Sequence, residues 1–64
     1  MNTEERNMML ELIDQLKGNR TLLRALLNLA LDHNKMLVPF VSDALRQNDD
    51  KIERALELID RRYR

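Results

Sequence analysis

Apolar residues recur at spacings of three and four along most of the chain, which is the pattern of helices with a buried face. The densest stretch, residues 22–31, places leucine or alanine on nearly every side of a helix. At 100° per residue, only one narrow polar strip remains: Arg20, Arg24, Asn28 and Asp32. We expect water to reach only that strip. The pattern therefore predicts a central helix that other helices surround.

A cap and a glycine bound the first predicted helix. Thr3 suits an N-cap, and the acidic residues after it suit the positive end of the helix dipole. Gly18 follows Lys17 and is a common C-terminal signal. We therefore predict a helix over residues 4–17. Its core face consists of Met9, Leu12, Ile13 and Leu16.

The second predicted helix spans residues 21–33, with Asn19 or Thr21 as its cap and Asn34 as a left-handed C-terminal residue. Its core face consists of Leu23, Leu26, Leu27 and Ala30. Because short connections join antiparallel neighbours, we predict that the first two helices form an antiparallel hairpin whose apolar faces meet.

One or two further helices follow Pro39, because proline is favoured in a first helical turn. The polar run 47–50 either separates two helices, 39–47 and 49–63, or forms a belt on one continuous helix. We favour the first alternative, in which this polar run separates two helices. A continuous helix of about 38 Å would be too long for the predicted hairpin to cover and would strongly favour a dimer. The expected apolar positions are Phe40, Val41, Ala44, Leu45, Ile52, Ala55, Leu56, Ile59 and Tyr63.

The composition predicts an all-α fold, since the chain has one glycine, one proline and 34% charged residues. Its 64 residues allow a single small helical domain, residues 1–64, and a domain of this size buries only about 60% of its unfolded surface. The absence of cysteine excludes disulfides and thiolate zinc sites. Self-association is the remaining common route to more burial, so we predict a small helical bundle that forms a homodimer, with a compact four-helix monomer as the alternative.

The charge balance gives no bias toward nucleic acid or membranes, because eleven basic and eleven acidic residues cancel. No apolar run approaches the roughly 18 residues of a membrane span. The first residues are acidic and polar, unlike a signal peptide, and the lack of cysteine fits a reducing compartment. We expect a cytoplasmic protein without membrane association.

Catalytic equipment is sparse. His33 is the only imidazole, and we interpret it as a helix C-terminal residue whose positive form the helix dipole stabilises. The sequence has no glycine-rich turn and no carboxylate pair in apolar surroundings. Asp49 and Asp50 lack the alternate-residue spacing of a calcium loop. We therefore expect a chain that is not an enzyme and that uses no metal or cofactor.

Arginines gather at the C-terminus and recur in the second predicted helix. The candidate phosphate contacts are Arg20, Arg24, Arg61, Arg62 and Arg64. The favoured interpretation is that the C-terminal arginines stabilise a helix through acid-first i,i+4 pairs, such as Glu57 with Arg61. A small nucleic-acid-binding regulator is the alternative functional hypothesis.

Several apolar residues lie off the predicted core faces, and such residues often mark an association surface. The candidate partner-binding residues are Met8, Leu10, Leu31 and Leu58, which lie off these faces, together with Tyr63 at the end of the last apolar face. The leading functional hypothesis is a non-enzymatic protein–protein interaction module, a small intracellular regulator or adaptor that binds another protein through an apolar helical surface.

Overall fold

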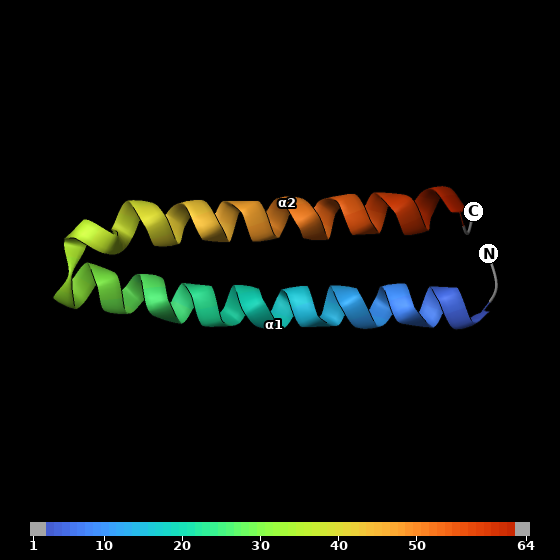
Figure 1. Ribbon diagram of the computed structural model, residues 1–64, viewed down its shortest axis with the longest axis horizontal. Coiled ribbons are helices and arrows are strands. Elements are labelled where there is room, and N and C mark those ends of the chain that lie inside the picture. The colour runs from blue at the N-terminus through green and yellow to red at the C-terminus, as the bar shows by residue number, and fades with distance from the viewer. Residues whose placement is uncertain (1–2, 63–64) are drawn as a thin grey trace.

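The structure, a computed structural model, describes residues 3–62 as two long helices and a short connection. Helix α1 spans Thr3–His33, the 3-10 turn η1 spans Lys35–Leu37, and helix α2 spans Val38–Arg62. The helices lie side by side and run in opposite directions, so that the start of α1 lies near the end of α2 (Figure 1). No strand occurs within residues 3–62, which confirms the predicted all-α class.

The predicted break at Gly18 is wrong. One helix replaces the two predicted over residues 4–17 and 21–33, so the hairpin between them does not exist. Glycine costs about 1 kcal/mol relative to alanine inside a helix, but packing against α2 on both sides of Gly18 offsets this cost. Thr21 does not cap a helix; its hydroxyl donates to the Lys17 carbonyl, 3.3 Å away, within α1.

The second half of the chain forms one helix, so the favoured break into helices 39–47 and 49–63 is wrong and the continuous alternative is confirmed. Pro39 lies in the first turn of α2, as predicted. Asn48 does not cap a helix, because its side chain packs against α1 instead. A dimer is not required by the length of α2, since α1 is also continuous and long enough to cover it.

The connection between the helices begins at Asn34, close to the predicted position. Its φ of −153° and ψ of 83° are extended, so the prediction of a left-handed residue is wrong. The Asn34 amide donates to the Ala30 carbonyl at 2.9 Å, and the Leu37 amide donates to the Asn34 carbonyl at 3.1 Å. These bonds satisfy backbone groups at the end of α1 and the start of η1.

The two helices meet along what we call the inner seam, whose positions alternate spacings of three and four. On α1 the seam contains Met9, Ile13, Leu16, Arg20, Leu23, Leu27 and Ala30. On α2 it contains Val38, Val41, Leu45, Asn48, Ile52, Ala55 and Ile59. This spacing is that of an antiparallel coiled coil. Its buried apolar core is small and consists of Ile13, Ala30 and Ile52.

Part of the predicted core is exposed. Leu12, Leu26 and Phe40, each assigned to a core face, are 51%, 50% and 73% exposed. The expected central helix over residues 22–31 is also not surrounded, because a two-helix structure covers only one side of it. Arg20 lies in the inner seam and not on a solvent strip.

Candidate protein-interaction surface

Helix α1 carries a second row of mostly apolar residues beside the inner seam, which we call the outer stripe. It consists of Met8, Leu12, Gln15, Asn19, Leu22, Leu26 and Leu29. Each member directly precedes a seam residue, so the outer stripe repeats the spacing of the seam about 100° further around the helix. All of its members are exposed, Leu22 most of all the leucines at 65%. The stripe thus has the pattern of a helix-packing face without a helix on it.

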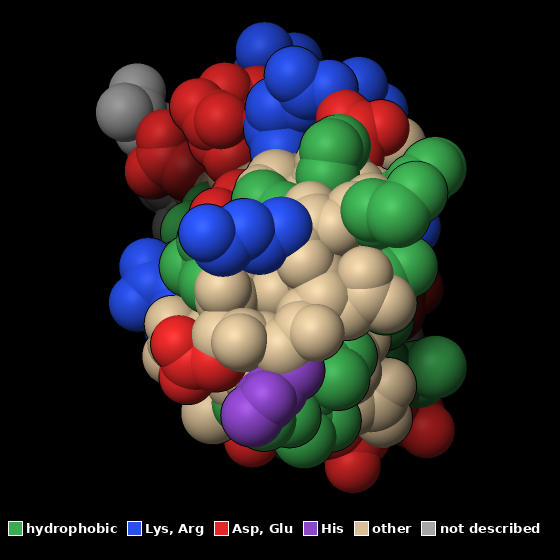
Figure 2. Space-filling model, turned by 90° about the vertical axis from the view of Figure 1, so that its left-hand side faces the viewer, with side chains coloured by type: hydrophobic (Ala, Val, Ile, Leu, Met, Phe, Trp, Pro, Cys, Tyr) green, Lys and Arg blue, Asp and Glu red, His purple; other side chains and the backbone are tan. Residues whose placement is uncertain are grey.

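The end of the molecule that holds the connection extends this apolar surface. Met36, Leu37 and Phe40 are exposed there, at 83%, 48% and 73%. In an antiparallel pair, the periodicity of α2 places Leu37 and Phe40 on the same side as the outer stripe. Figure 2, which views the molecule from this end, shows hydrophobic side chains along its right-hand side, over both helices.

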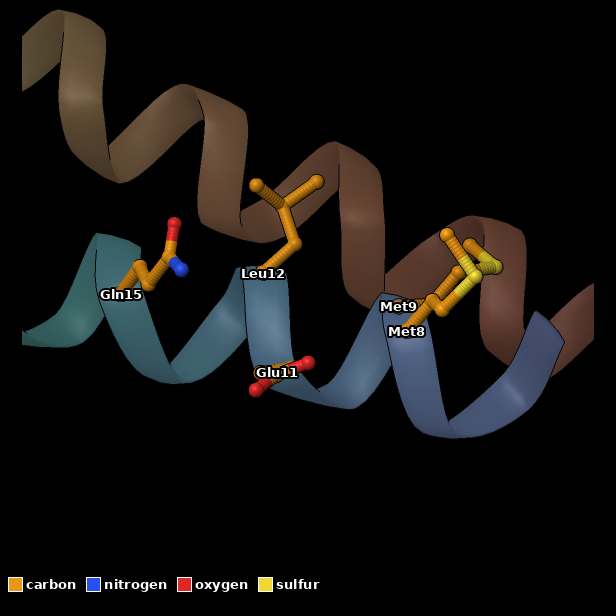
Figure 3. Close-up of a pocket in the computed structure, with 5 residues that line it drawn as sticks. All are labelled: Met8, Met9, Glu11, Leu12 and Gln15. Carbon is orange, nitrogen blue, oxygen red and sulfur yellow. The ribbon is translucent and has the colours of Figure 1, made fainter. Parts of the chain in front are cut away.

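Near the start of α1 the outer stripe borders an open groove of about 410 Å³ (Figure 3). Its lining residues are Met8, Met9, Glu11, Leu12 and Gln15. Figure 3 shows Leu12 and Gln15 on the side of α1 along which α2 runs, whereas Glu11 is directed away from α2. The two methionines give the groove a flexible and polarizable wall, which adapts readily to apolar side chains of different shapes.

Charge is absent from the outer stripe between Met8 and Leu29. The two amides, Gln15 and Asn19, occupy its middle, and they both donate and accept hydrogen bonds. Continuing the same spacing adds Glu5 at one end and His33 at the other, both exposed. The stripe is therefore apolar toward both ends, uncharged at its centre and bounded by titratable groups.

The opposite flank of the hairpin is mixed. Leu10 and Leu31 lie on it, 40% and 48% exposed, but Lys17 and Arg24 occupy the positions between them. At 1.5 Å per residue the two leucines are about 32 Å apart. They are isolated apolar residues of the kind that folded proteins commonly expose.

The predicted partner-binding residues therefore do not form one surface. Met8 belongs to the outer stripe, and α2 places Leu58, 44% exposed, on the same side of the hairpin. Leu10 and Leu31 lie on the opposite flank, and Tyr63 lies outside the described residues. The sequence reasoning missed Leu22 and Leu29 as surface residues. The signal that finds them is the second row of three-and-four spacings, which is visible only when α1 is treated as one helix.

The predicted phosphate contacts are also dispersed. Arg20 is half-buried and paired with Asp49 across the inner seam, whereas Arg24 is exposed on the mixed flank. Arg61 lies on α2 about 18 Å beyond Asp49 along the helix. The side chain of Arg62, and all of Arg64, lie outside the described structure. Arg20, Arg24 and Arg61 thus do not lie together in one basic patch.

Polar groups cross the inner seam at its middle. Asn48 is 8% exposed, and its side-chain Nδ2 donates to the Leu16 carbonyl at 2.8 Å. One turn further along α1, a guanidinium nitrogen of Arg20 lies 3.9 Å from Oδ1 of Asp49. That oxygen is shielded from solvent and accepts no hydrogen bond within the described part of the chain. A polar layer of this kind fixes the alignment of two helices, because sliding them would leave buried polar groups unmatched.

Within residues 3–62, no three His, Asp or Glu side chains are close enough together to hold a metal ion. His33 is exposed at the end of α1. Neither helix, over its described residues, has the length and apolar character that crossing a membrane requires.

Comparison with known proteins finds no family model that matches the chain, and no curated protein or solved structure that is significantly similar to it.

Proposed function

We propose that the chain is a non-enzymatic protein–protein interaction module, a small regulator or adaptor, and that its outer stripe binds a helix of another polypeptide. The observation that supports this proposal is the continuous, uncharged row of exposed residues from Met8 to Leu29. Exposed apolar surfaces of this extent usually mark binding sites. The absence of cysteine fits a cytoplasmic location, which is part of the proposal.

The spacing of the outer stripe favours a helical partner. Rows at alternating intervals of three and four accept the side chains of a second helix between them, as the inner seam does with α2. An extended strand repeats its side chains every two residues and does not match this pattern. Peptide helices that bind in apolar grooves use anchors at comparable intervals.

Site-specific photo-crosslinking in the source cells tests the proposal. The crosslinking residue benzoylphenylalanine replaces Leu22 on the outer stripe in one variant, and Asp14, which is also exposed but lies on another side of α1, in the control. We expect irradiation to join the position-22 variant to a protein and to leave the control unjoined.

The mass of the joined product identifies the class of partner. A crosslink between position 22 and any protein supports the interaction module. No crosslinked protein at position 22, or equal crosslinking at positions 22 and 14, would contradict the proposal. Crosslinking to nucleic acid alone would favour the alternative hypothesis of a nucleic-acid-binding regulator.

A further inference from the structure

We infer that the partner of the outer stripe is a second copy of this chain, with the two α1 helices packed antiparallel across a twofold axis near Asn19. This inference rests on the proposed function and specifies its partner. It is supported by the area of exposed surface, by the dimensions of the stripe and by the order of residues along it.

The chain exposes more surface than a compact protein of the same mass. The excess is about the area that a dimer interface buries on each partner. A compact monomer of 7.6 kDa exposes about 4,300 Å², whereas this chain exposes 5311 Å². The excess is about 1,000 Å². A standard protein–protein interface removes about 800 Å² from each partner. One interface along the outer stripe therefore brings the chain to the exposure expected for its size.

The shape of the molecule leads to the same result. Its radius of gyration is 14.8 Å, whereas a compact domain of this length has a radius of about 11 Å. The molecule is 47 Å long but only 15 and 11 Å across. Two helices side by side have no second layer, and compact domains are built from at least two packed layers. A second hairpin on the outer stripe supplies that layer.

The length of the outer stripe matches α1 itself. Met8 and Leu29 are about 32 Å apart at 1.5 Å per residue. A helix that covers the whole stripe needs at least about 21 residues, and α1 has 31. A second α1 also brings an identical stripe, so each copy covers the exposed leucines of the other.

An antiparallel arrangement pairs the residues of the stripe favourably. With the twofold axis near Asn19, Met8 lies opposite Leu29 of the second copy, and Leu12 lies opposite Leu26 of the second copy. The Asn19 side chains of the two copies meet, and an amide both donates to and accepts from an identical amide. Apolar residues thus face apolar residues toward both ends, and amides lie near the centre, where Gln15 lies opposite Leu22 of the second copy.

The ends of the stripe favour antiparallel over parallel pairing. The same register places Glu5 opposite His33 of the second copy, and these groups attract each other when the imidazole is protonated. In a parallel pair, Glu5 would lie opposite Glu5 of the second copy, where like charges repel. Antiparallel pairing also places the connection end of one copy, with exposed Phe40, beside the methionine-lined groove of the other.

Sedimentation equilibrium of the purified chain over a wide range of concentrations tests the inference. We expect the wild type to sediment at twice its 7.6 kDa mass. Leu22→Gln on the outer stripe should raise the dimer dissociation constant by about 100-fold or more, because each dimer loses two buried leucines. The matched control, Leu31→Gln on the mixed flank, should change it by less than about threefold. A wild type that is monomeric throughout, or equal effects of the two variants, would overturn the inference.

Disulfide trapping measures the orientation and does not depend on the stability of the leucine variants. The chain has no cysteine, so a single introduced thiol reports one position. Asn19→Cys should form a disulfide-linked dimer upon oxidation, whereas Met8→Cys should not, because antiparallel pairing separates the two copies of residue 8. Linkage at residue 8, or none at residue 19, would overturn the antiparallel arrangement.

These results are separable from those that test the proposed function. A monomeric wild type that nevertheless crosslinks at position 22 to a different protein in cells would reject the second copy and leave the interaction module supported. A crosslinked product of twice the chain mass supports both. No crosslinked protein in cells and no dimer in solution would reject both.

Discussion

The inner seam and the outer stripe of α1 have the same spacing, the same length and similar leucine content, yet α2 covers only the seam. They differ in their polar residues. The seam contains Arg20, whose charge is matched by Asp49 on α2, whereas the stripe contains only amides between Met8 and Leu29. The comparison teaches that spacing identifies a packing face, but polar residues identify what covers it. A charge in a seam needs a complementary group on a different element, whereas an amide can pair either with a different element, as Asn48 does, or with an identical amide.

The largest expected effect is a difference in the free energy of unfolding between alanine variants at two adjacent residues, one in each row. Ile13 is 4% exposed in the seam, and Leu12 is 51% exposed on the stripe. Ile13→Ala should lower the free energy of unfolding by about 2–4 kcal/mol, because a buried side chain leaves a cavity. Leu12→Ala should cost clearly less at the lowest concentration at which the chain remains folded. Urea denaturation followed by circular dichroism measures both.

Protein concentration sharpens this test. If a second copy covers the outer stripe, the cost of Leu12→Ala should grow with concentration toward that of Ile13→Ala, since the dimer then buries Leu12. A cost of Leu12→Ala that equals that of Ile13→Ala at every concentration would mean that the two rows do not differ in the way the structure indicates.

Much of the fold follows from the sequence, but its two long helices do not follow from local signals. Pro39 and the polar Asn34 locate the connection well, because proline restricts its neighbours whatever surrounds them. Gly18 and Asn48 are ordinary stop and cap residues, yet both lie inside helices. The apolar face of the helix continues past each of these residues. The packing along that face outweighs their local preference, about 1 kcal/mol, for ending or capping a helix.

The surface was less predictable than the fold. Leu12 and Leu26 were expected in the core, because one helix with two adjacent apolar rows does not reveal which row its neighbour covers. That choice depends on where α2 lies, and α2 is positioned by contacts far apart in the chain, such as Asn48 with Leu16. Met8 was identified because it lies away from the first row whichever break is assumed.

The next effect tests the polar layer of the inner seam. Asn48→Leu should raise the free energy of unfolding by about 1–2 kcal/mol, because a buried amide is replaced by an apolar side chain of similar size. The Leu16 carbonyl keeps its bond within α1. The gain should come with a less unique alignment of the helices, visible as additional peaks in amide NMR spectra. A large loss of stability would show instead that the hydrogen bond to Leu16 contributes more than the buried apolar area.

A smaller effect concerns Gly18, which lies off both rows. A Cβ atom added there meets no other atom within 4 Å. Gly18→Ala should therefore raise the free energy of unfolding by about 0.5–1 kcal/mol, because alanine has the higher helix propensity. The dimer dissociation constant should remain nearly unchanged. Thermal unfolding with sedimentation measures both quantities, and a weakened dimer would indicate that the second copy approaches α1 closer to Gly18 than to the stripe.

The smallest effect belongs to the Arg20–Asp49 pair, and its size decides what a charge does in the inner seam. The nearest atoms are 3.9 Å apart. Oδ1 of Asp49 is itself shielded from solvent, but the two side chains are 39% and 46% exposed as a whole, so water around them weakens their attraction. A double-mutant cycle with Arg20→Met and Asp49→Asn should give a coupling below about 1 kcal/mol that decreases further in high salt. Arg20→Met alone should not destabilise the hairpin, because the thioether suits the seam. Such a result would show that the main role of the pair is to align α1 with α2. This role would explain why the inner seam contains a charged residue and the outer stripe does not. A coupling of several kcal/mol would instead make the pair a main source of stability and would remove the contrast between the two rows.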